Sequence, residues 1–161
     1  MRPTTDDVID DEEARAIAVR RTIDAPRARV FALWTDPRHL ARWWGPDGFT
    51  TTTRAFDFRP GGVWEHTMHG PDGTDYPNWV RWREIVPPER LVWEHGTHDG
   101  DPEAFVSTVL FAERGGATEI TLRTVFASAA QRDAVVERYG ALEGAHQTLA
   151  RLAATVAEDP T

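Results

Sequence analysis

Two histidine pairs are the first residues in this sequence whose type and spacing could do chemistry. His66 follows a Trp-Glu dipeptide with His69 three residues later, and His95 and His98 repeat this arrangement. Histidine binds transition metals and exchanges protons near neutral pH, so metal binding and acid–base catalysis are the chemistries to consider. Side chains three residues apart on a strand point to opposite faces, so neither pair can chelate a metal from one strand.

A metal site shared between the two pairs is also disfavoured. The segments that contain His66 and His95 are the third and fifth strands of the predicted order, so one other strand separates them in a meander. Strands two apart in a sheet lie roughly 9.5 Å from each other, which is wide for one zinc ion. The sequence therefore predicts no metal site and no tightly held cofactor.

The composition excludes several other kinds of active site. The 161 residues include no cysteine, which removes disulfides, thiol nucleophiles and thiolate metal ligands. All eighteen basic residues are arginine, so a Schiff base on a lysine is excluded. The two serines, Ser107 and Ser128, both lie outside a Gly-x-Ser-x-Gly nucleophile elbow.

The charge of the chain and its distribution narrow the possible partners. The net charge is −8, which argues against a nucleic-acid partner because phosphate binding needs a basic face. Acidic residues gather near the N-terminus, so we interpret residues 1–14 as a flexible acidic tail and residues 15–158 as a single domain. No segment has the roughly 20 apolar residues of a membrane span or the apolar core of a signal peptide. We expect a cytoplasmic protein with no membrane partner, either a monomer or a homodimer.

The elements that must position any site begin with a long C-terminal helix. Ser128, with Gln131 three residues later, has the form of a capping box that starts a helix. A helix over residues 129–157 would be roughly 40 Å long, enough to cross a small domain. Gly140 and Gly144 predict a bend or close packing within it. Steps of four and three residues place one stripe on a single face: Val135, Tyr139, Leu142, His146, Leu149, Ala153 and Val156.

Strand signals fill the middle of the chain. Alternating segments are separated by turn sequences such as Arg-Pro-Gly-Gly at 59–62 and Gly-Pro-Asp-Gly at 70–73. Consecutive strands with short connections favour an antiparallel meander. We therefore predict an α+β order of one strand, two short helices, six strands and the terminal helix. The predicted strands cover 15–23, 49–58, 63–69, 75–86, 90–95, 103–113 and 118–126.

Several motifs, spread in order through the chain, resemble a known family. They are Asp24-Ala25-Pro26, Trp34-Thr35-Asp36-Pro37, Trp43-Trp44-Gly45-Pro46, Asp57 with Arg59-Pro60-Gly61-Gly62, Gly70-Pro71-Asp72-Gly73, Pro87-Pro88-Glu89-Arg90-Leu91, and Leu149 with Arg151-Leu152. On these motifs the chain resembles the START-like (SRPBCC) superfamily, and within it the bacterial relatives of the C-terminal domain of the heat-shock protein 90 ATPase activator. The resemblance implies a helix-grip fold, in which a curved antiparallel sheet of about seven strands wraps around the long C-terminal helix and encloses a hydrophobic cavity.

The chain departs from the family's pattern at two positions. Val80 stands where many relatives carry glycine before the aromatic residue of the fourth strand, and Ala145 stands where many carry tryptophan in the last helix. The second departure removes bulk on the cavity side of the helix, which implies a roomier pocket. Trp43 and Trp44, followed by a Gly-Pro stop, are expected to seal one end of the cavity.

We predict that the inward faces of the sheet and of the terminal helix line this cavity. Aromatic and aliphatic walls with a few polar groups are typical of a small-molecule site, and the alternative is that the same residues fill a solid core. His146 is the best discriminator, because a histidine in an apolar stripe is either a satisfied core residue or part of a wall facing a polar ligand. The predicted cavity residues are Trp64, His66, Met68, Val80, Trp82, Trp93, His95, Phe111, Leu122, Tyr139, Leu142 and His146.

Three functions follow as hypotheses. The first is binding of a small hydrophobic or aromatic molecule in the cavity. The second is a cyclase or dehydratase activity, known among START-like relatives, in which His66 or His95 would act with Tyr139 or Glu84 in proton transfer; a surface ion pair with Arg90 is the alternative role for Glu84. The third is a protein-interaction module like the co-chaperone, although the resemblance covers only the second domain of that activator.

Overall fold

The computed structural model of the chain describes residues 12–158, which form a seven-stranded sheet and its covering helices. The strands are β1 (Ala16–Ile23), β2 (Thr50–Phe56), β3 (Val63–His69), β4 (Asp75–Val86), β5 (Arg90–Gly96), β6 (Phe105–Arg114) and β7 (Ala117–Val125). The helices are the 3-10 helix η1 (Glu12–Arg15) and the α-helices α2 (Arg27–Ala32), α3 (Pro37–Trp43), α4 (Ala129–Tyr139) and α5 (Ala141–Glu158).

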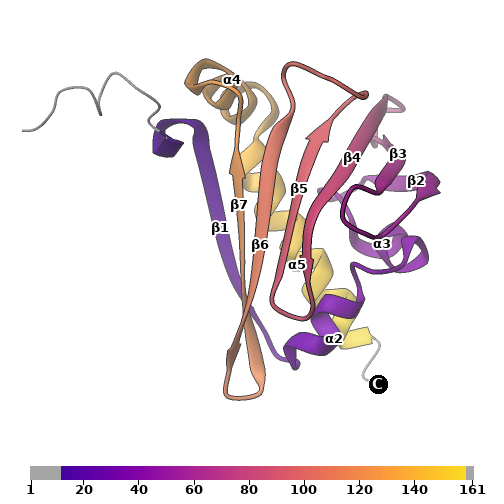
Figure 1. Cartoon of the computed structure of the whole chain (residues 1–161), viewed down its shortest axis with the longest axis vertical. Coiled ribbons are helices and arrows are strands. Elements are labelled where there is room, and N and C mark those ends of the chain that lie inside the picture. Colours follow the sequence, from indigo (N-terminus) through magenta and orange to yellow (C-terminus); the bar gives the residue numbers. More distant parts are fainter. Residues whose placement is uncertain (1–11, 159–161) are drawn as a thin grey trace, which may run out of the picture.

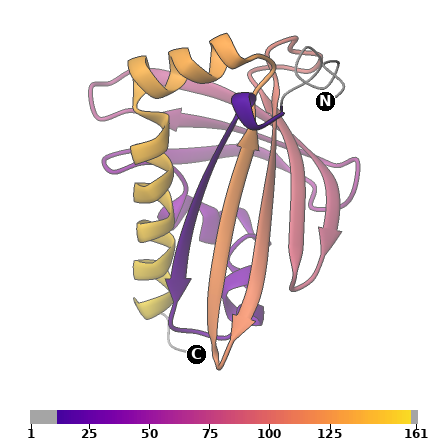
Figure 2. The same cartoon turned by 90° about the vertical axis from the view of Figure 1, so that its left-hand side faces the viewer.

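The sheet is antiparallel, with the strand order β1-β7-β6-β5-β4-β3-β2. The strands β2 to β7 form the predicted meander, and β1 joins it by pairing with β7, where Val19 lies opposite Leu122. The sheet lies in front of α5 in Figure 1, and the view turned by 90° in Figure 2 shows it curving around this helix. The predicted α+β fold class, a curved antiparallel sheet of about seven strands around a C-terminal helix, is confirmed.

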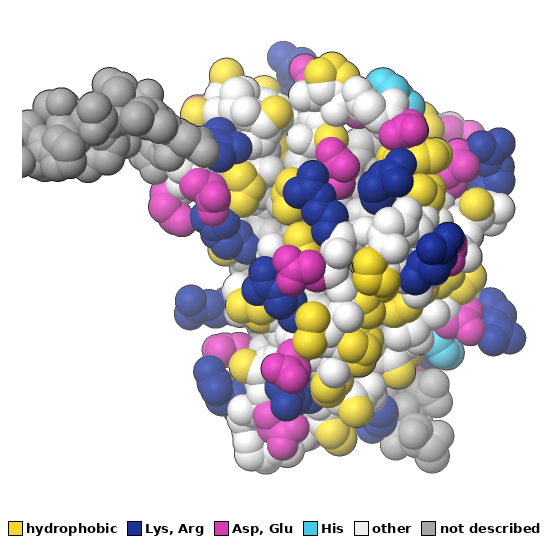
Figure 3. All heavy atoms as spheres, viewed as in Figure 1, with side chains coloured by type: hydrophobic (Ala, Val, Ile, Leu, Met, Phe, Trp, Pro, Cys, Tyr) yellow, Lys and Arg dark blue, Asp and Glu magenta, His cyan; other side chains and the backbone are white. Residues whose placement is uncertain are grey.

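Alternation along the strands gives the sheet a buried face and an exposed face. On β3, Trp64 and His66 are buried, whereas Glu65 between them turns outward and pairs with Arg54 of β2 at 2.6 Å. Figure 3 shows the face that turns away from α5, where positive and negative side chains are interspersed among apolar ones. The inward face is therefore the one that can hold a core or a cavity.

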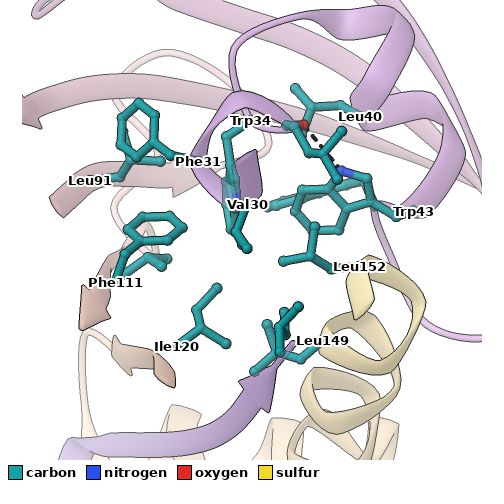
Figure 4. Close-up of a cluster of buried hydrophobic side chains, with 14 of the residues drawn as sticks. Val30, Phe31, Trp34, Leu40, Trp43, Leu91, Phe111, Ile120, Leu149 and Leu152 are labelled. Carbon is teal, nitrogen blue, oxygen red and sulfur yellow. Dashed lines mark hydrogen bonds between the residues drawn. The ribbon is translucent and has the colours of Figure 1, made fainter. Parts of the chain in front are cut away.

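The core lies where α2, α3 and the C-terminal half of α5 cover the inward face of the sheet. Trp34 and Trp43 meet with ring centroids 4.7 Å apart, and Leu149 and Leu152 of α5 belong to the same buried cluster (Figure 4). The indole nitrogen of Trp43 donates to the carbonyl oxygen of Leu33 at 3.1 Å, so this ring is satisfied as well as buried.

The predicted single helix over residues 129–157 is two helices. Gly140 adopts a left-handed conformation with φ of 62°, which ends α4, and α5 starts at the next residue. Figure 2 shows α4 lying across the end of α5. Glycine takes this conformation without a steric penalty, so the bend expected at Gly140 is a full break. The predicted cap is present, since the Ser128 hydroxyl accepts from the backbone N–H of Gln131 at 3.0 Å.

The predicted acidic tail is only partly within the described residues. Residues 1–11 lie outside them, whereas Glu12 and Glu13 belong to η1. Their carboxylates accept bonds from the guanidinium of Arg123 on β7 at 2.6 and 2.7 Å. The last residues assigned to the tail are thus attached to the sheet, because Arg123 offers them a paired set of donors.

Candidate ligand-binding cavity

A cavity of about 350 Å³ lies between the inward face of the sheet and the junction of α4 with α5. Strands β4 to β7 form its floor, the loop after α3 forms one wall, and α4 with the first half of α5 covers it. The volume falls within the range of about 300–1,000 Å³ that is usual for small-molecule sites. The cavity is therefore large enough for a small organic molecule.

Tryptophans form the most rigid wall of the cavity. The rings of Trp34, Trp44 and Trp93 all line it, and their centroids lie 5.5 to 6.0 Å from one another. Phe105 extends the wall and stacks on His95 with centroids 4.7 Å apart. Tilted and edge-to-face packing of this kind holds each ring in place and presents apolar carbon to a ligand.

The facing wall on α5 consists of small side chains. Ala141, Gly144, Ala145 and Thr148 follow one another at helical spacing and all line the cavity. None of them reaches far toward the tryptophans, so the space between helix and sheet stays open at this end of α5.

The loop after α3 is fixed by a clamp that the sequence did not reveal. One guanidinium nitrogen of Arg151 donates to the carbonyl oxygens of Gly45 and Pro46 at 2.9 Å each and lies 3.4 Å from that of Trp44. Gly45 has a φ of +101°, and a Cβ atom there would come within 2.7 Å of the methyl carbon of Met68. Arginine and glycine together therefore set the position of Trp44 as a cavity wall.

His95 is the cavity histidine, and its ring is held in one neutral form. Its Nδ1 accepts from the indole nitrogen of Trp93 at 3.3 Å, so its proton sits on Nε2, which donates to the Asn78 side-chain oxygen at 2.7 Å. Burial lowers the pKa of His95 to about 4. The ring is thus uncharged at neutral pH, and both its nitrogens have partners.

The remaining polar groups of the cavity floor are also uncharged. The hydroxyls of Ser107 on β6 and Thr124 on β7 lie 2.9 Å apart and bond to each other, and the Thr148 hydroxyl donates to the carbonyl oxygen of Gly144 at 2.9 Å. No aspartate, glutamate, lysine or arginine side chain lines the cavity among residues 12–158. The site therefore offers a ligand no counter-charge.

His66 lies beside the cavity and does not line it. The side chain is 3% exposed and stacks on Trp64 with centroids 3.8 Å apart, and its ring centroid lies 6.0 Å from that of the cavity-lining Trp44. Neither ring nitrogen has a hydrogen-bond partner among the described residues. Burial, with a smaller contribution from the charge of His95, lowers the pKa of His66 to about 2, so this histidine is neutral.

The structure divides the predicted cavity residues into three groups. Met68, Trp93, His95, Leu122 and Tyr139 line the cavity, with Tyr139 at its mouth and 69% exposed. A second group lies outside the cavity in the closely packed interior: Trp64, His66, Val80, Trp82 and Phe111.

The third group, Leu142 and His146, is exposed on α5 and lies outside the cavity. The break at Gly140 ends the stripe that was expected to carry both residues inward, so it no longer continues from α4 into α5. His146 is therefore neither a core residue nor a wall of the cavity.

The sequence interpretation missed other lining residues. Trp34 and Phe126 stand just beyond the ends of α2 and β7, and burial at these positions does not show that the side chains meet a cavity. Ser107 and Thr124 alternate with outward residues on β6 and β7, and this alternation, applied to their strands, would have placed both on the inward face.

The other acid–base candidate lies far from this arrangement. Glu84 is exposed and accepts from Arg90 at 3.0 Å, which is the predicted surface ion pair. Within residues 12–158, no three histidine, aspartate or glutamate side chains are arranged to hold a metal ion. Over the same residues, no helix is long and apolar enough to cross a membrane.

Several solved structures of bacterial proteins superpose on most of this chain. The solution structure of a protein from Arthrobacter aurescens is 31% identical, covers 92% of this chain and 90% of its own, and superposes with a TM-score of 0.83. A crystal structure from Chromobacterium violaceum is 26% identical over 88% of this chain and 96% of its own, with a TM-score of 0.77. The AHSA1 protein of Silicibacter pomeroyi shares the fold at 24% identity and a TM-score of 0.72, covering 89% of this chain and 99% of its own.

Among curated proteins, none matches the sequence significantly. The family model described as Activator of Hsp90 ATPase homolog 1-like protein matches residues 24–157, which is most of the chain. This match agrees with the motifs, the sheet order and the helix that the sheet encloses. The chain belongs to the Activator of Hsp90 ATPase homolog 1-like family, with the START-like fold of that group.

Proposed function

We propose that this protein binds a small, uncharged apolar or aromatic molecule in the cavity between the sheet and α5. One observation carries the proposal: a space of about 350 Å³ is walled by tryptophan and phenylalanine rings, and no charged side chain of the described residues lines it. Apolar walls with a few polar groups for orientation are the usual makeup of a small-molecule site.

The electrostatics of the wall favour a neutral ligand. An ion that entered the cavity would lose its hydration and find no opposite charge, because His95 is neutral and its nitrogens already have partners. Burying an unpaired charge is far more costly than burying an apolar surface of the same size. The absence of a counter-charge in the cavity wall therefore supports an uncharged ligand.

The acid–base hypothesis has less support. His66 does not line the cavity, and a pKa of about 4 makes His95 a weak base at neutral pH. Tyr139 lies at the mouth, largely in solvent. The enzyme and co-chaperone roles are alternatives that no particular contact favours, and the cytoplasmic location and the monomeric or homodimeric state stay predictions.

A cavity-filling variant tests the proposal. We expect the neutral fluorescent probe N-phenyl-1-naphthylamine to bind the wild-type protein and to lose most of its affinity in Ala145→Phe, because the new ring would occupy the cavity. Ala154→Phe is the matched control, since Ala154 is exposed on the same helix and lies outside the cavity. Failure of the probe to bind wild-type protein, or equal binding by Ala145→Phe, would overturn the proposal.

A further inference from the structure

The hydrogen bonds on the cavity floor leave one donor without an acceptor. Ser107 and Thr124 face each other across β6 and β7, with their oxygens 2.9 Å apart. Each hydroxyl carries one hydrogen, and their mutual bond uses only one of the two. No other bond involves either hydroxyl among the described residues, so the second hydrogen has no acceptor from the protein there.

Because this pair is buried, leaving one hydroxyl hydrogen without an acceptor is energetically unfavourable. Ser107 and Thr124 are only 2% and 8% exposed, yet both line the cavity. A buried donor without an acceptor loses its bonds to water and gains nothing in return. Among the other polar groups that line the cavity, His95 bonds through both nitrogens, and Asn78 bonds both to it and to the carbonyl oxygen of Tyr76. The indole N–H groups of Trp34 and Trp44 on the facing wall are also buried without an acceptor among the described residues, so the Ser107–Thr124 pair is the unsatisfied donor among the cavity-lining side chains on the strands.

Around the pair, the shape and charge of the cavity restrict what can supply the acceptor. The rings of Trp34, Trp44 and Trp93 present flat apolar surfaces that suit an aromatic ligand. A carboxylate would be a strong acceptor, but within the part of the chain that the structure describes no arginine or lysine side chain lines the cavity to balance its charge. An uncharged oxygen attached to an aromatic ring meets both conditions.

Building on the proposed function, we propose that the ligand is a neutral aromatic carbonyl compound whose oxygen accepts a hydrogen bond from the Ser107–Thr124 pair. The ring system lies against the tryptophan wall, and the carbonyl oxygen points to β6 and β7. The pair thus acts as the specificity-determining contact, because it distinguishes a ketone from a hydrocarbon of the same shape.

Three naphthalene probes of similar size test this contact in competition with the fluorescent probe: 2-acetylnaphthalene, 2-ethylnaphthalene and 2-naphthoate. We expect the ketone to bind about threefold to tenfold more tightly than the hydrocarbon, which corresponds to one neutral hydrogen bond. The carboxylate should bind at least about 100-fold more weakly than the ketone, since its charge would be buried without a partner.

The double variant Ser107→Ala/Thr124→Val assigns the preference to the pair. It removes both hydroxyls at once and leaves no orphaned partner, so the fold should tolerate it. The ketone should then bind no better than the hydrocarbon, whose affinity should not change. Thr121→Val is the matched control, because Thr121 lies on β7 but outside the cavity.

The outcomes separate this inference from the proposed function. If the hydrocarbon binds and the ketone has no advantage, or if the advantage survives in the double variant, the carbonyl contact is overturned while the cavity still binds ligands. If none of the probes binds the wild-type protein, the proposed function itself fails.

Discussion

Two stretches of α5 face the tryptophan cluster, and they differ in how far they fill the space between this helix and the cluster. Toward its C-terminus, Leu149 and Leu152 reach into the cluster around Trp34 and Trp43, and the interior is closely packed (Figure 4). Near its start, the helix presents small residues to the cavity wall, and about 350 Å³ stays open.

The difference shows that the size of the α5 side chains decides whether space stays open between this helix and the tryptophan cluster. A leucine on α5 closes the gap to the sheet, whereas an alanine or glycine leaves it. The break at Gly140 adds to this effect, because it turns α4 aside and leaves Leu142 exposed on the first turn of α5. The closely packed end should therefore supply stability, and the hollow end should supply binding.

The largest expected effect is at the closely packed end. Leu152→Ala should lower the free energy of unfolding by about 4 kcal/mol, because it removes a fully buried side chain and leaves a void in a rigid cluster. Leu142→Ala, the same substitution at the hollow end, should change it by less than about 0.5 kcal/mol. Urea unfolding of both variants measures the difference, and equal losses would show that the two ends do not differ in packing.

Acid should destabilise the closely packed interior through His66. Its pKa in the folded protein, about 2, lies below the ordinary value of 6.5, so its stabilising contribution is present above pH 6.5 and is lost as pH falls. At pH 5 this histidine should account for about 2 kcal/mol of lost stability, from 1.36 kcal/mol per pH unit. In His66→Phe, the loss between pH 7 and pH 5 should be smaller by about that amount.

The exposed His146 provides the control for the acid effect. His146→Phe alters a histidine on the solvent side of α5 and should lose as much stability as the wild type between pH 7 and pH 5. Chemical unfolding at the two pH values gives the comparison. The same acid loss in His66→Phe as in the wild type would mean that burial of this ring does not couple folding to protonation.

Local patterns predicted the order of the elements and the antiparallel meander, and the resemblance to a known family implied that the sheet curves around the terminal helix. The positions of the strands were predicted from alternation and turn residues, because the inward positions of a sheet with one buried face are mostly apolar. The break between α4 and α5 was not predicted, since periodicity continues through Gly140 and does not show that its φ is positive. Sequence spacing alone cannot distinguish a glycine that bends a helix from one that ends it.

The candidate site was harder to predict than the fold. The period of a strand shows which side chains share a face, so Trp82, Trp93 and His95 were all placed on the inward face. Of these three, Trp93 and His95 line the cavity and Trp82 does not. Whether an inward residue packs against a leucine or faces empty space depends on where α5 crosses the sheet. The position of this crossing is set by tertiary packing and cannot be read from the period of a single strand. Trp34 and Phe126 were therefore not assigned to the cavity.

The smallest effects distinguish the two glycines at the hollow end. Gly144 lies inside α5, and a Cβ atom there would meet only Pro46, at an ordinary contact distance of 3.5 Å. Gly144→Ala should therefore raise the free energy of unfolding by about 0.5 to 1 kcal/mol, through the better helix propensity of alanine. Gly140→Ala should lower it by about 1 kcal/mol, because its φ of 62° is strained for any residue with a Cβ atom. Opposite signs in urea unfolding would locate the end of α4 at Gly140, whereas stabilisation by both alanines would mean that the helix runs straight through, filling the hollow end with the stripe that the sequence predicts.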